Sequence, residues 1–188
     1  IKTICVGNIY LGGTGKTPLT IKIYEILNKL DYKVATVKKN YLSQKDEQLL
    51  LNQKTNLIVS KSRIDAIHQG LNQNLDFLIF DDGLQEMRIE FNIKFVCFKS
   101  KYWIGNGQIL PAGPMREKIS SLKKFDAVFL NGNSNNFEKI KSQIHNINPN
   151  IKIFRTFYEI SNIKRYNLNL KYLIFSGIGN PSDFKEIL

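Results

Sequence analysis

A glycine-rich stretch near the start of the chain constrains its fold most. Residues 7–18 read GNIYLGGTGKTP and follow the apolar run 4–6. The apolar residues that come next recur at helical spacing: Leu19, Ile23, Ile26, Leu27 and Leu30. A glycine-rich loop between a strand and a helix is typical of phosphate-binding sites, because backbone N–H groups and the helix N-terminus surround the anion.

This stretch predicts a nucleotide site with defined contacts. We expect Lys16 to reach the β- and γ-phosphates and the Thr17 hydroxyl to bind Mg²⁺. The residues expected to bind ATP are Tyr10, Leu11, Gly12, Gly13, Thr14, Gly15, Lys16 and Thr17. The usual pattern has a glycine where this chain has Tyr10, so we expect Gly12 and Gly13 to supply the backbone freedom. An incidental glycine-rich turn is the less favoured alternative, because strand, loop and helix occur in the right order.

A second motif is an apolar segment that ends in two carboxylates. Residues 77–80 are apolar, and Asp81, Asp82 and Gly83 follow them. In phosphate-loop enzymes an acid at the end of such a strand helps to hold Mg²⁺. The alternative is a strand followed by an ordinary Asp-Gly turn. We favour the metal-binding interpretation because the phosphate loop precedes this segment in the same chain.

Strand-like and helix-like segments alternate along the chain. The expected strands are 4–6, 33–37, 57–59, 76–81, 93–98, 127–130, 151–154 and 172–175. One expected helix follows the phosphate loop, and the others cover 46–51, 62–71, 119–124 and 137–147, with another starting near 181. Residues 38–45 and 103–116 are expected to be loops. The second loop should be well ordered because it carries Trp103, Ile104, Ile109 and Leu110. This alternation predicts an α/β fold: a P-loop NTPase-like, mostly parallel sheet with helices on both faces and ligands at the carboxyl ends of the strands.

The composition narrows the class of partner. The chain of 188 residues is long enough for one domain, and its formal net charge of +11 favours anionic partners such as nucleotides, nucleic acid or an anionic membrane. Charge alone does not choose among them. Cys5 and Cys97 lie in apolar runs and predict a reducing compartment, while His68 and His145 are isolated and predict no metal cluster.

Four blocks of sequence resemble the tetraacyldisaccharide 4′-kinases of lipid A biosynthesis. They are 6–18, the Asp-Glu pair at 46–47 with the leucines at 49–51, the segment DDGLQ at 81–85, and GNG at 105–107 with LPAGP at 110–114 and Arg116-Glu117. A weaker fifth block is GIGNP at 177–181. The fourth block is the most specific, because a phosphate loop alone occurs in many families.

The resemblance implies a lipid kinase. It would transfer the γ-phosphoryl group of ATP to the 4′-hydroxyl of a lipid A disaccharide 1-phosphate, with Mg²⁺, at the cytoplasmic face of the inner membrane of a Gram-negative bacterium. The family's catalytic acid corresponds to Asp46, which would accept the hydroxyl proton beside the catalytic Lys16. Glu47, Asp81 and Asp82 would organise Mg²⁺ with Thr17, and Arg116 and Asn106 would contact substrate. The expected partners are this lipid and an anionic membrane surface, and no nucleic acid is expected.

The chain also departs from the family pattern. Four positions differ from the usual residue: Asn40, Lys45, Glu86 and Lys99. We expect residues 1–188 to form a single P-loop kinase core without the family's N-terminal membrane segment and C-terminal Asp-His-His motif. Two other readings remain: another P-loop ATPase or GTPase, which the fourth block argues against, and a non-catalytic basic module that keeps a nucleotide as a structural ligand.

Overall fold

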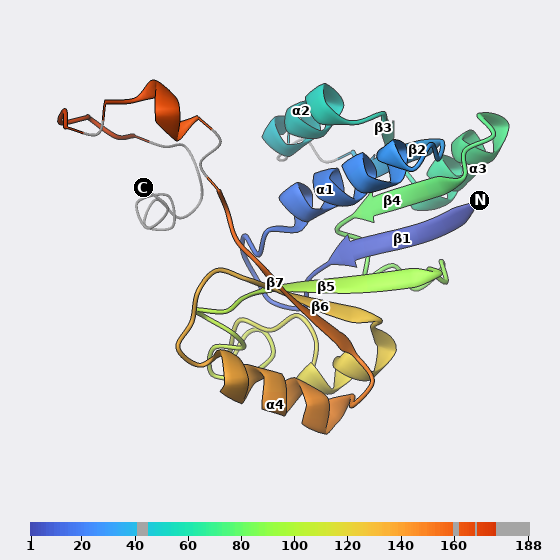
Figure 1. Ribbon diagram of the computed structural model, residues 1–188. Helices are drawn as coiled ribbons and strands as arrows, with labels where there is room; N and C mark the ends of the chain where they lie inside the picture. The colour runs from blue at the N-terminus through green and yellow to red at the C-terminus, as the bar shows by residue number, and fades with distance from the viewer. Residues whose placement is uncertain (41–44, 160–161, 168, 176–188) are drawn as a thin grey trace.

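The chain folds around one seven-stranded sheet (Figure 1). The computed structural model describes residues 1–40, 45–159, 162–167 and 169–175. The strand order is β3-β2-β4-β1-β5-β6-β7, and each neighbouring pair is parallel. The strands are β1 (Lys2–Gly7), β2 (Val34–Lys39), β3 (Leu57–Ser60), β4 (Phe77–Asp81), β5 (Ile93–Lys99), β6 (Ala127–Asn131) and β7 (Lys152–Thr156). The predicted parallel α/β sheet is confirmed.

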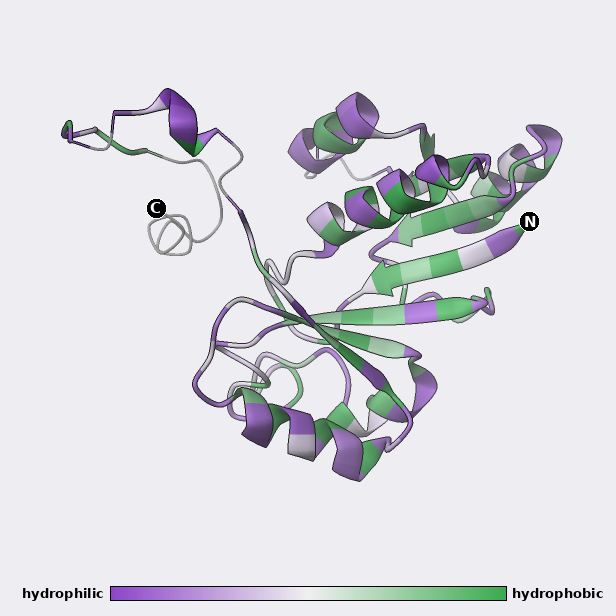
Figure 2. Cartoon of the chain, in the orientation of Figure 1, coloured by the Kyte–Doolittle hydropathy of each residue, from purple (hydrophilic) through white to green (hydrophobic). Residues whose placement is uncertain are grey.

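Helices cover both faces of the sheet, as predicted. The helix α1 (Lys16–Lys29) packs Leu19, Ile23 and Leu27 on one face, against Ile4 and Val6 of β1 and their neighbours. The opposite face is covered by α3 (Arg63–Asn72), the 3₁₀ helix η1 (Ile119–Lys124) and α4 (Phe137–Ile147). The helix α2 (Lys45–Lys54) lies against α1 and β3, and a short 3₁₀ turn η2 (Ile163–Arg165) follows β7. Figure 2 shows the strands as mostly hydrophobic and the outer helix faces as hydrophilic.

Strand β1 lies centrally and positions the site. Its neighbours are β4 on one side and β5 on the other, and Val6 is the register partner of Asp81. Because all strands run in the same direction, their carboxyl ends meet at one edge of the sheet. The loop that leaves β1 and the carboxylate that ends β4 are therefore brought to the same place.

Several sequence-based predictions were wrong in detail. Residues 38 and 39 belong to β2 rather than to a loop. Residues 172–175 form no strand and are exposed, because no neighbouring strand pairs with them within the described residues. Ile26 and Leu30 of the first helix are 49% and 61% exposed; the buried stripe instead includes Thr17 and Thr20. The helix expected near 181 and the block at 177–181 lie outside the described residues.

Cys5 and Cys97 are buried and free, as their apolar surroundings indicated. In the parts of the chain that the structure describes, no helix combines the length and the apolar character needed to cross a membrane.

Candidate active site

The loop between β1 and α1 closes around an open space through two glycines in the left-handed region. Gly12 has φ 100° and Gly15 has φ 89°, values that residues with a side chain rarely adopt. Asn8 braces the loop from inside, because its Nδ2 donates to the Gly12 carbonyl and to Thr14 Oγ1, each at 3.2 Å. Gly12 thus supplies the predicted freedom, whereas Gly13 adopts no positive φ.

The proline-rich loop at 103–116 clamps the phosphate loop from outside. The Leu11 N–H donates to the Pro114 carbonyl at 2.8 Å, and the Arg116 N–H donates to the Ile9 carbonyl at 2.7 Å. Tyr10 forms an isolated β-bridge with Met115, and its ring packs against the core. The loop is ordered, as predicted. Trp103, Ile104 and Ile109 pack on the core, but Leu110 is 47% exposed.

A cluster of four side chains lies where α1, β2, β4 and α2 meet. Thr17 Oγ1 donates to Asp81 Oδ2 at 2.9 Å. The ammonium of Lys38 donates to the same Asp81 oxygen at 2.9 Å and to Glu47 Oε2 at 2.5 Å. Strand alternation explains the cluster: Lys38 and Asp81 lie near the ends of adjacent strands, on the face covered by α1.

Burial and neighbouring charges have opposite effects on the pKa values of Asp81 and Lys38. Burial raises the pKa of the Asp81 carboxyl above its usual range, although Lys38 and the Thr17 hydroxyl act in the opposite direction. Burial would lower the pKa of Lys38, but the two carboxylates outweigh it and the pKa is raised. Both Lys38 and Asp81 are almost fully buried, so each depends on the other for its charge.

Asp82 organises a second set of contacts. Its backbone adopts φ 63°, in the left-handed region. Arg116 Nη1 lies 3.3 Å from Asp82 Oδ1, and Lys16 Nζ lies 4.0 Å from Oδ2. Arg63 donates to the Asp82 carbonyl and lies 3.6 Å from Glu86. Asp82 thus lies near three basic side chains: its carboxylate faces Arg116 and Lys16, and its carbonyl accepts from Arg63.

Two predicted site residues lie apart from the buried cluster. Asp46 is exposed in the first turn of α2, next to Glu47. Asn106 braces its own loop, since its Nδ2 donates to the Ala112 carbonyl at 2.9 Å and its Oδ1 accepts from the Gln108 N–H. The catalytic role of Asp46 and the substrate contact of Asn106 stay predictions.

The oxygen atoms around Asp81 fit a magnesium ion. Its other oxygen, Oδ1, is buried without a hydrogen-bond partner in the described structure, and the Thr17 hydroxyl lies beside it. Carboxylate and hydroxyl oxygens are the ligands that Mg²⁺ prefers, with phosphate oxygens completing the shell. Nowhere in the described ranges do three His, Cys, Asp or Glu side chains gather into a metal-holding group, so the protein ligands alone would not form a closed cage.

The sequence analysis missed Lys38 and Asn8. The polar character of residues 38–45 predicts a loop, whereas the alternation of Val34, Thr36 and Lys38 is the signal that favours a strand. Asn8 lies within the glycine-rich stretch, but nothing in the sequence indicated that its side chain braces the loop. Gln85 was also missed as a brace, although its amide donates to the Asn8 carbonyl at 3.1 Å and to Glu117 at 3.0 Å.

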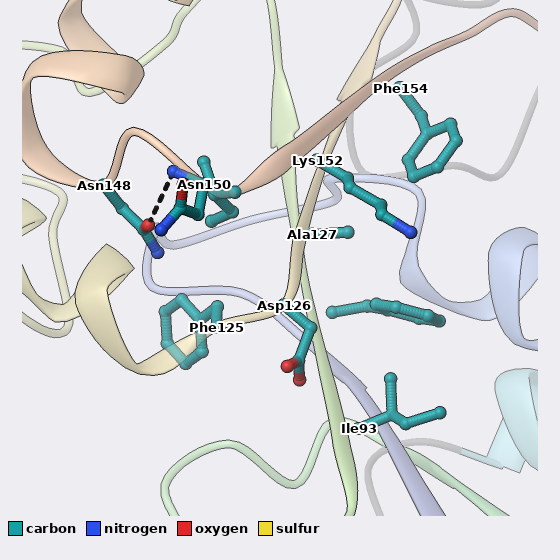
Figure 3. A pocket seen from close by; sticks show the side chains of 10 residues that line it. Ile93, Phe125, Asp126, Ala127, Asn148, Asn150, Lys152 and Phe154 are labelled. Atoms are coloured by element: carbon teal, nitrogen blue, oxygen red, sulfur yellow. Dashed lines mark hydrogen bonds between the residues drawn. The ribbon is translucent and has the colours of Figure 1, made fainter.

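An apolar pocket lies elsewhere, at the amino ends of β5, β6 and β7 (Figure 3). It is lined by Ile93, Phe95 and Phe154 together with Asp126 and Asn148. Because it lies at the edge of the sheet opposite the phosphate loop, it contributes nothing to the site described above.

Known sequences similar to this chain belong to one family of kinases. The family model for tetraacyldisaccharide-1-P 4′-kinase (LpxK) matches residues 1–188. A tetraacyldisaccharide 4′-kinase of Pelagibacter ubique is 49% identical over 188 residues, which cover all of this chain and 60% of that protein. One of Haemophilus influenzae is 31% identical over 205 residues, covering 98% of this chain and 60% of that protein. The chain therefore spans about 60% of the length of these relatives.

Solved structures agree on the fold. LpxK from Aquifex aeolicus, in a crystal structure described as an "apo" form in complex with ATP, has a TM-score of 0.58 at 16% identity and covers 95% of this chain and 76% of its own. The hydrogenase maturation factor HypB from Archaeoglobus fulgidus has a TM-score of 0.58 at 16% identity, covering 83% of this chain and 81% of its own. At this identity the likeness concerns the fold alone, which is P-loop NTPase-like as predicted.

Proposed function

The chain belongs to the tetraacyldisaccharide-1-P 4′-kinase family, and on this premise we propose that it transfers the γ-phosphoryl group of ATP to the 4′-hydroxyl of a tetraacyldisaccharide 1-phosphate in lipid A biosynthesis. The observation that carries the proposal is the 2.9 Å hydrogen bond from Thr17 to Asp81, which joins the phosphate loop to the acid that ends β4. Another P-loop ATPase or GTPase is disfavoured by the family match over the whole chain.

The phosphate loop would bind the nucleotide. Backbone N–H groups of the loop and the N-terminus of α1 would surround the phosphates, as they do in this fold; the Leu11 N–H is excluded because it already donates to the Pro114 carbonyl. Lys16 is the first residue of α1, and its ammonium would leave Asp82 for the β- and γ-phosphates. The ATP named with the Aquifex aeolicus structure supports this choice of nucleotide.

Thr17, Asp81 and Glu47 would hold Mg²⁺, with Asp82 next to them. When bound, the ion supplies charge neutralisation between the β- and γ-phosphates. Thr17 and Asp81 already lie within hydrogen-bonding distance, so these two ligands need little rearrangement. Arg116, fixed by the Asp82 carboxylate, would face the phosphate or the lipid headgroup.

Asp46 would act as the general base. As the oxygen of the acceptor hydroxyl forms its bond to the γ-phosphorus, the bond from that phosphorus to the β–γ bridging oxygen breaks and ADP leaves. The hydroxyl proton passes to the Asp46 carboxylate, which is exposed in the first turn of α2 and so open to an incoming sugar. Glu47, bonded to the buried Lys38, ties this turn of α2 to Asp81.

The acceptor implies a membrane surface, at the cytoplasmic face of the inner membrane. The net charge of +11 supports attraction to anionic lipid, which salt screens over about 10 Å at 0.1 M. Co-sedimentation with anionic vesicles at low and high salt measures this attraction; no binding at low salt would exclude it.

The proposed function is tested with a full-length protein that carries this chain. The assay supplies ATP, Mg²⁺ and a tetraacyldisaccharide 1-phosphate in detergent micelles, and mass spectrometry follows the lipid. We expect a mass gain of one phosphoryl group that depends on the lipid's free 4′-hydroxyl. ATP hydrolysis without any phosphorylated lipid would support the ATPase alternative, and nucleotide binding without turnover would support the non-catalytic module.

A further inference from the structure

Four described side chains form the cluster around Asp81. Three of them, Thr17, Glu47 and Asp81, are proposed ligands of Mg²⁺, whereas the fourth, Lys38, is a cation and cannot be a ligand. Its side chain is 2% exposed, and its ammonium lies at the carboxyl end of β2, between β4 and α2. A buried ammonium costs free energy unless carboxylates surround it, and here two carboxylates do so. The chain therefore places a cation of its own beside these two carboxylates.

The ammonium contacts both carboxylates that a magnesium ion would use, although Asp81 Oδ1 accepts no hydrogen bond in the described structure. Asp81 Oδ2 accepts from both Thr17 and Lys38, and Glu47 Oε2 accepts from Lys38 at 2.5 Å. Thr17, Asp81 and Glu47 are the ligands proposed above for Mg²⁺. A divalent ion bound to them would lie a few ångströms from the ammonium, where like charges repel strongly in a partly buried site.

We propose that Lys38 is an internal cation that competes with Mg²⁺ for Asp81 and Glu47. Without nucleotide, the ammonium balances both carboxylates and keeps α2 tied to β4. Full coordination of the metal by both carboxylates requires Lys38 to move away from them, and the phosphates of ATP supply the further ligands that favour this exchange. Metal binding is thereby coupled to nucleotide binding. The inference rests on the proposed function only in taking the Thr17–Asp81 pair as the metal site.

The test measures binding of Mn²⁺ to the nucleotide-free protein by electron paramagnetic resonance. Lys38→Met removes the charge while keeping the length of the side chain. Lys54→Met is the matched control, because it removes the same charge from the exposed end of α2. We expect Lys38→Met to bind Mn²⁺ at least about tenfold more tightly than the wild type, since even part of the Coulomb repulsion exceeds this. Lys54→Met should bind like the wild type.

A second variant at the same position keeps the test valid if Lys38→Met does not fold. Lys38→Gln keeps a donor that can reach Asp81 but carries no charge, and it should also bind Mn²⁺ more tightly. Thermal melts add an independent readout: Mg²⁺ should raise the melting temperature of both Lys38 variants more than that of the wild type. Equal Mn²⁺ affinities in wild type, Lys38→Gln and Lys54→Met would overturn the proposal, and so would weaker binding by Lys38→Gln. Failure of the proposed function appears separately, as no binding of an ATP analogue by the wild type.

Discussion

The Thr17 hydroxyl donates a 2.9 Å hydrogen bond to Asp81 Oδ2, across the boundary between the start of α1 and the end of β4. This contact joins the phosphate loop to the acid that ends β4, although the two residues are 64 positions apart in the sequence. It also leaves Asp81 Oδ1 buried without a partner in the described structure. Both features support Asp81 as a ligand of the proposed Mg²⁺.

Asp81→Asn should therefore raise the Mg²⁺ concentration needed for half-maximal activity by about 10–100-fold, the usual cost of losing a group that supports a metal. The measurement is a Mg²⁺ titration of phosphoryl transfer. Asp126→Asn is the control, since Asp126 lies at the opposite edge of the sheet and accepts from the Lys94 N–H. A wild-type Mg²⁺ response in Asp81→Asn would move the ligand role to Asp82 or Glu47.

Lys16→Ala should weaken binding of an ATP analogue by about 10–100-fold, because it removes charge-assisted hydrogen bonds to phosphate. Isothermal titration calorimetry measures the affinity, and circular dichroism checks the fold. Lys22→Ala provides the comparison within the same helix, where the side chain is 63% exposed and pairs with Glu25. If both variants bind the analogue as the wild type does, the phosphate-loop assignment fails.

Gly15 and Gly13 offer a matched pair of substitutions. A Cβ at Gly15 would lie 2.7 Å from Asn131 Nδ2, and φ is 89° there. A Cβ at Gly13 would meet no atom within 4 Å. Gly15→Ala should lower the free energy of unfolding by about 1–2 kcal/mol, and it should weaken nucleotide binding. Gly13→Ala should do neither. Urea unfolding measures the difference, and equal stabilities would show that the Gly15 turn can relax.

Sequence periodicity predicted the sheet well because apolar strands and glycine-rich turns leave strong local patterns. Strand pairing brought Thr17 and Asp81 together as the motifs implied. Strand alternation gave only a weak signal for Lys38, because its burial depends on two carboxylates that reach it from other elements. The strand predicted at 172–175, a segment that the structure describes, is absent. The segment is apolar enough for a strand, but a strand also needs a neighbouring strand to pair with, and the sequence pattern does not reveal one.

Glu86, one of the departures from the family pattern, predicts a pH effect. Its hydrogen bonds from Arg88 lower the pKa of the Glu86 carboxyl from 4.5 to about 2, and Arg63 adds to this. A lowered pKa means that the ionised form stabilises the fold above about pH 4.5 and that this contribution is lost as the pH falls toward 2. Glu86→Gln should thus be less stable than the wild type at pH 6, with the gap narrowing at pH 3.

Urea unfolding at several pH values measures that gap. Glu138→Gln removes an exposed carboxylate from the first turn of α4 and serves as the control. A gap that stays constant between pH 6 and pH 3 would mean that the Glu86 charge is not what the two arginines recognise.

We propose that the site transfers a phosphoryl group to the lipid with Asp46 as the general base. The most direct measurement is the steady-state rate of transfer from labelled ATP to a tetraacyldisaccharide 1-phosphate, for full-length wild type and Asp46→Asn. We expect kcat to fall by about 10²–10⁴-fold while the KM for ATP changes little, because the contribution of a base appears in the transition state. A nearly unchanged kcat, with only a loss of about 0.3–1 kcal/mol in stability, would identify Asp46 as a helix-terminal charge and contradict the account.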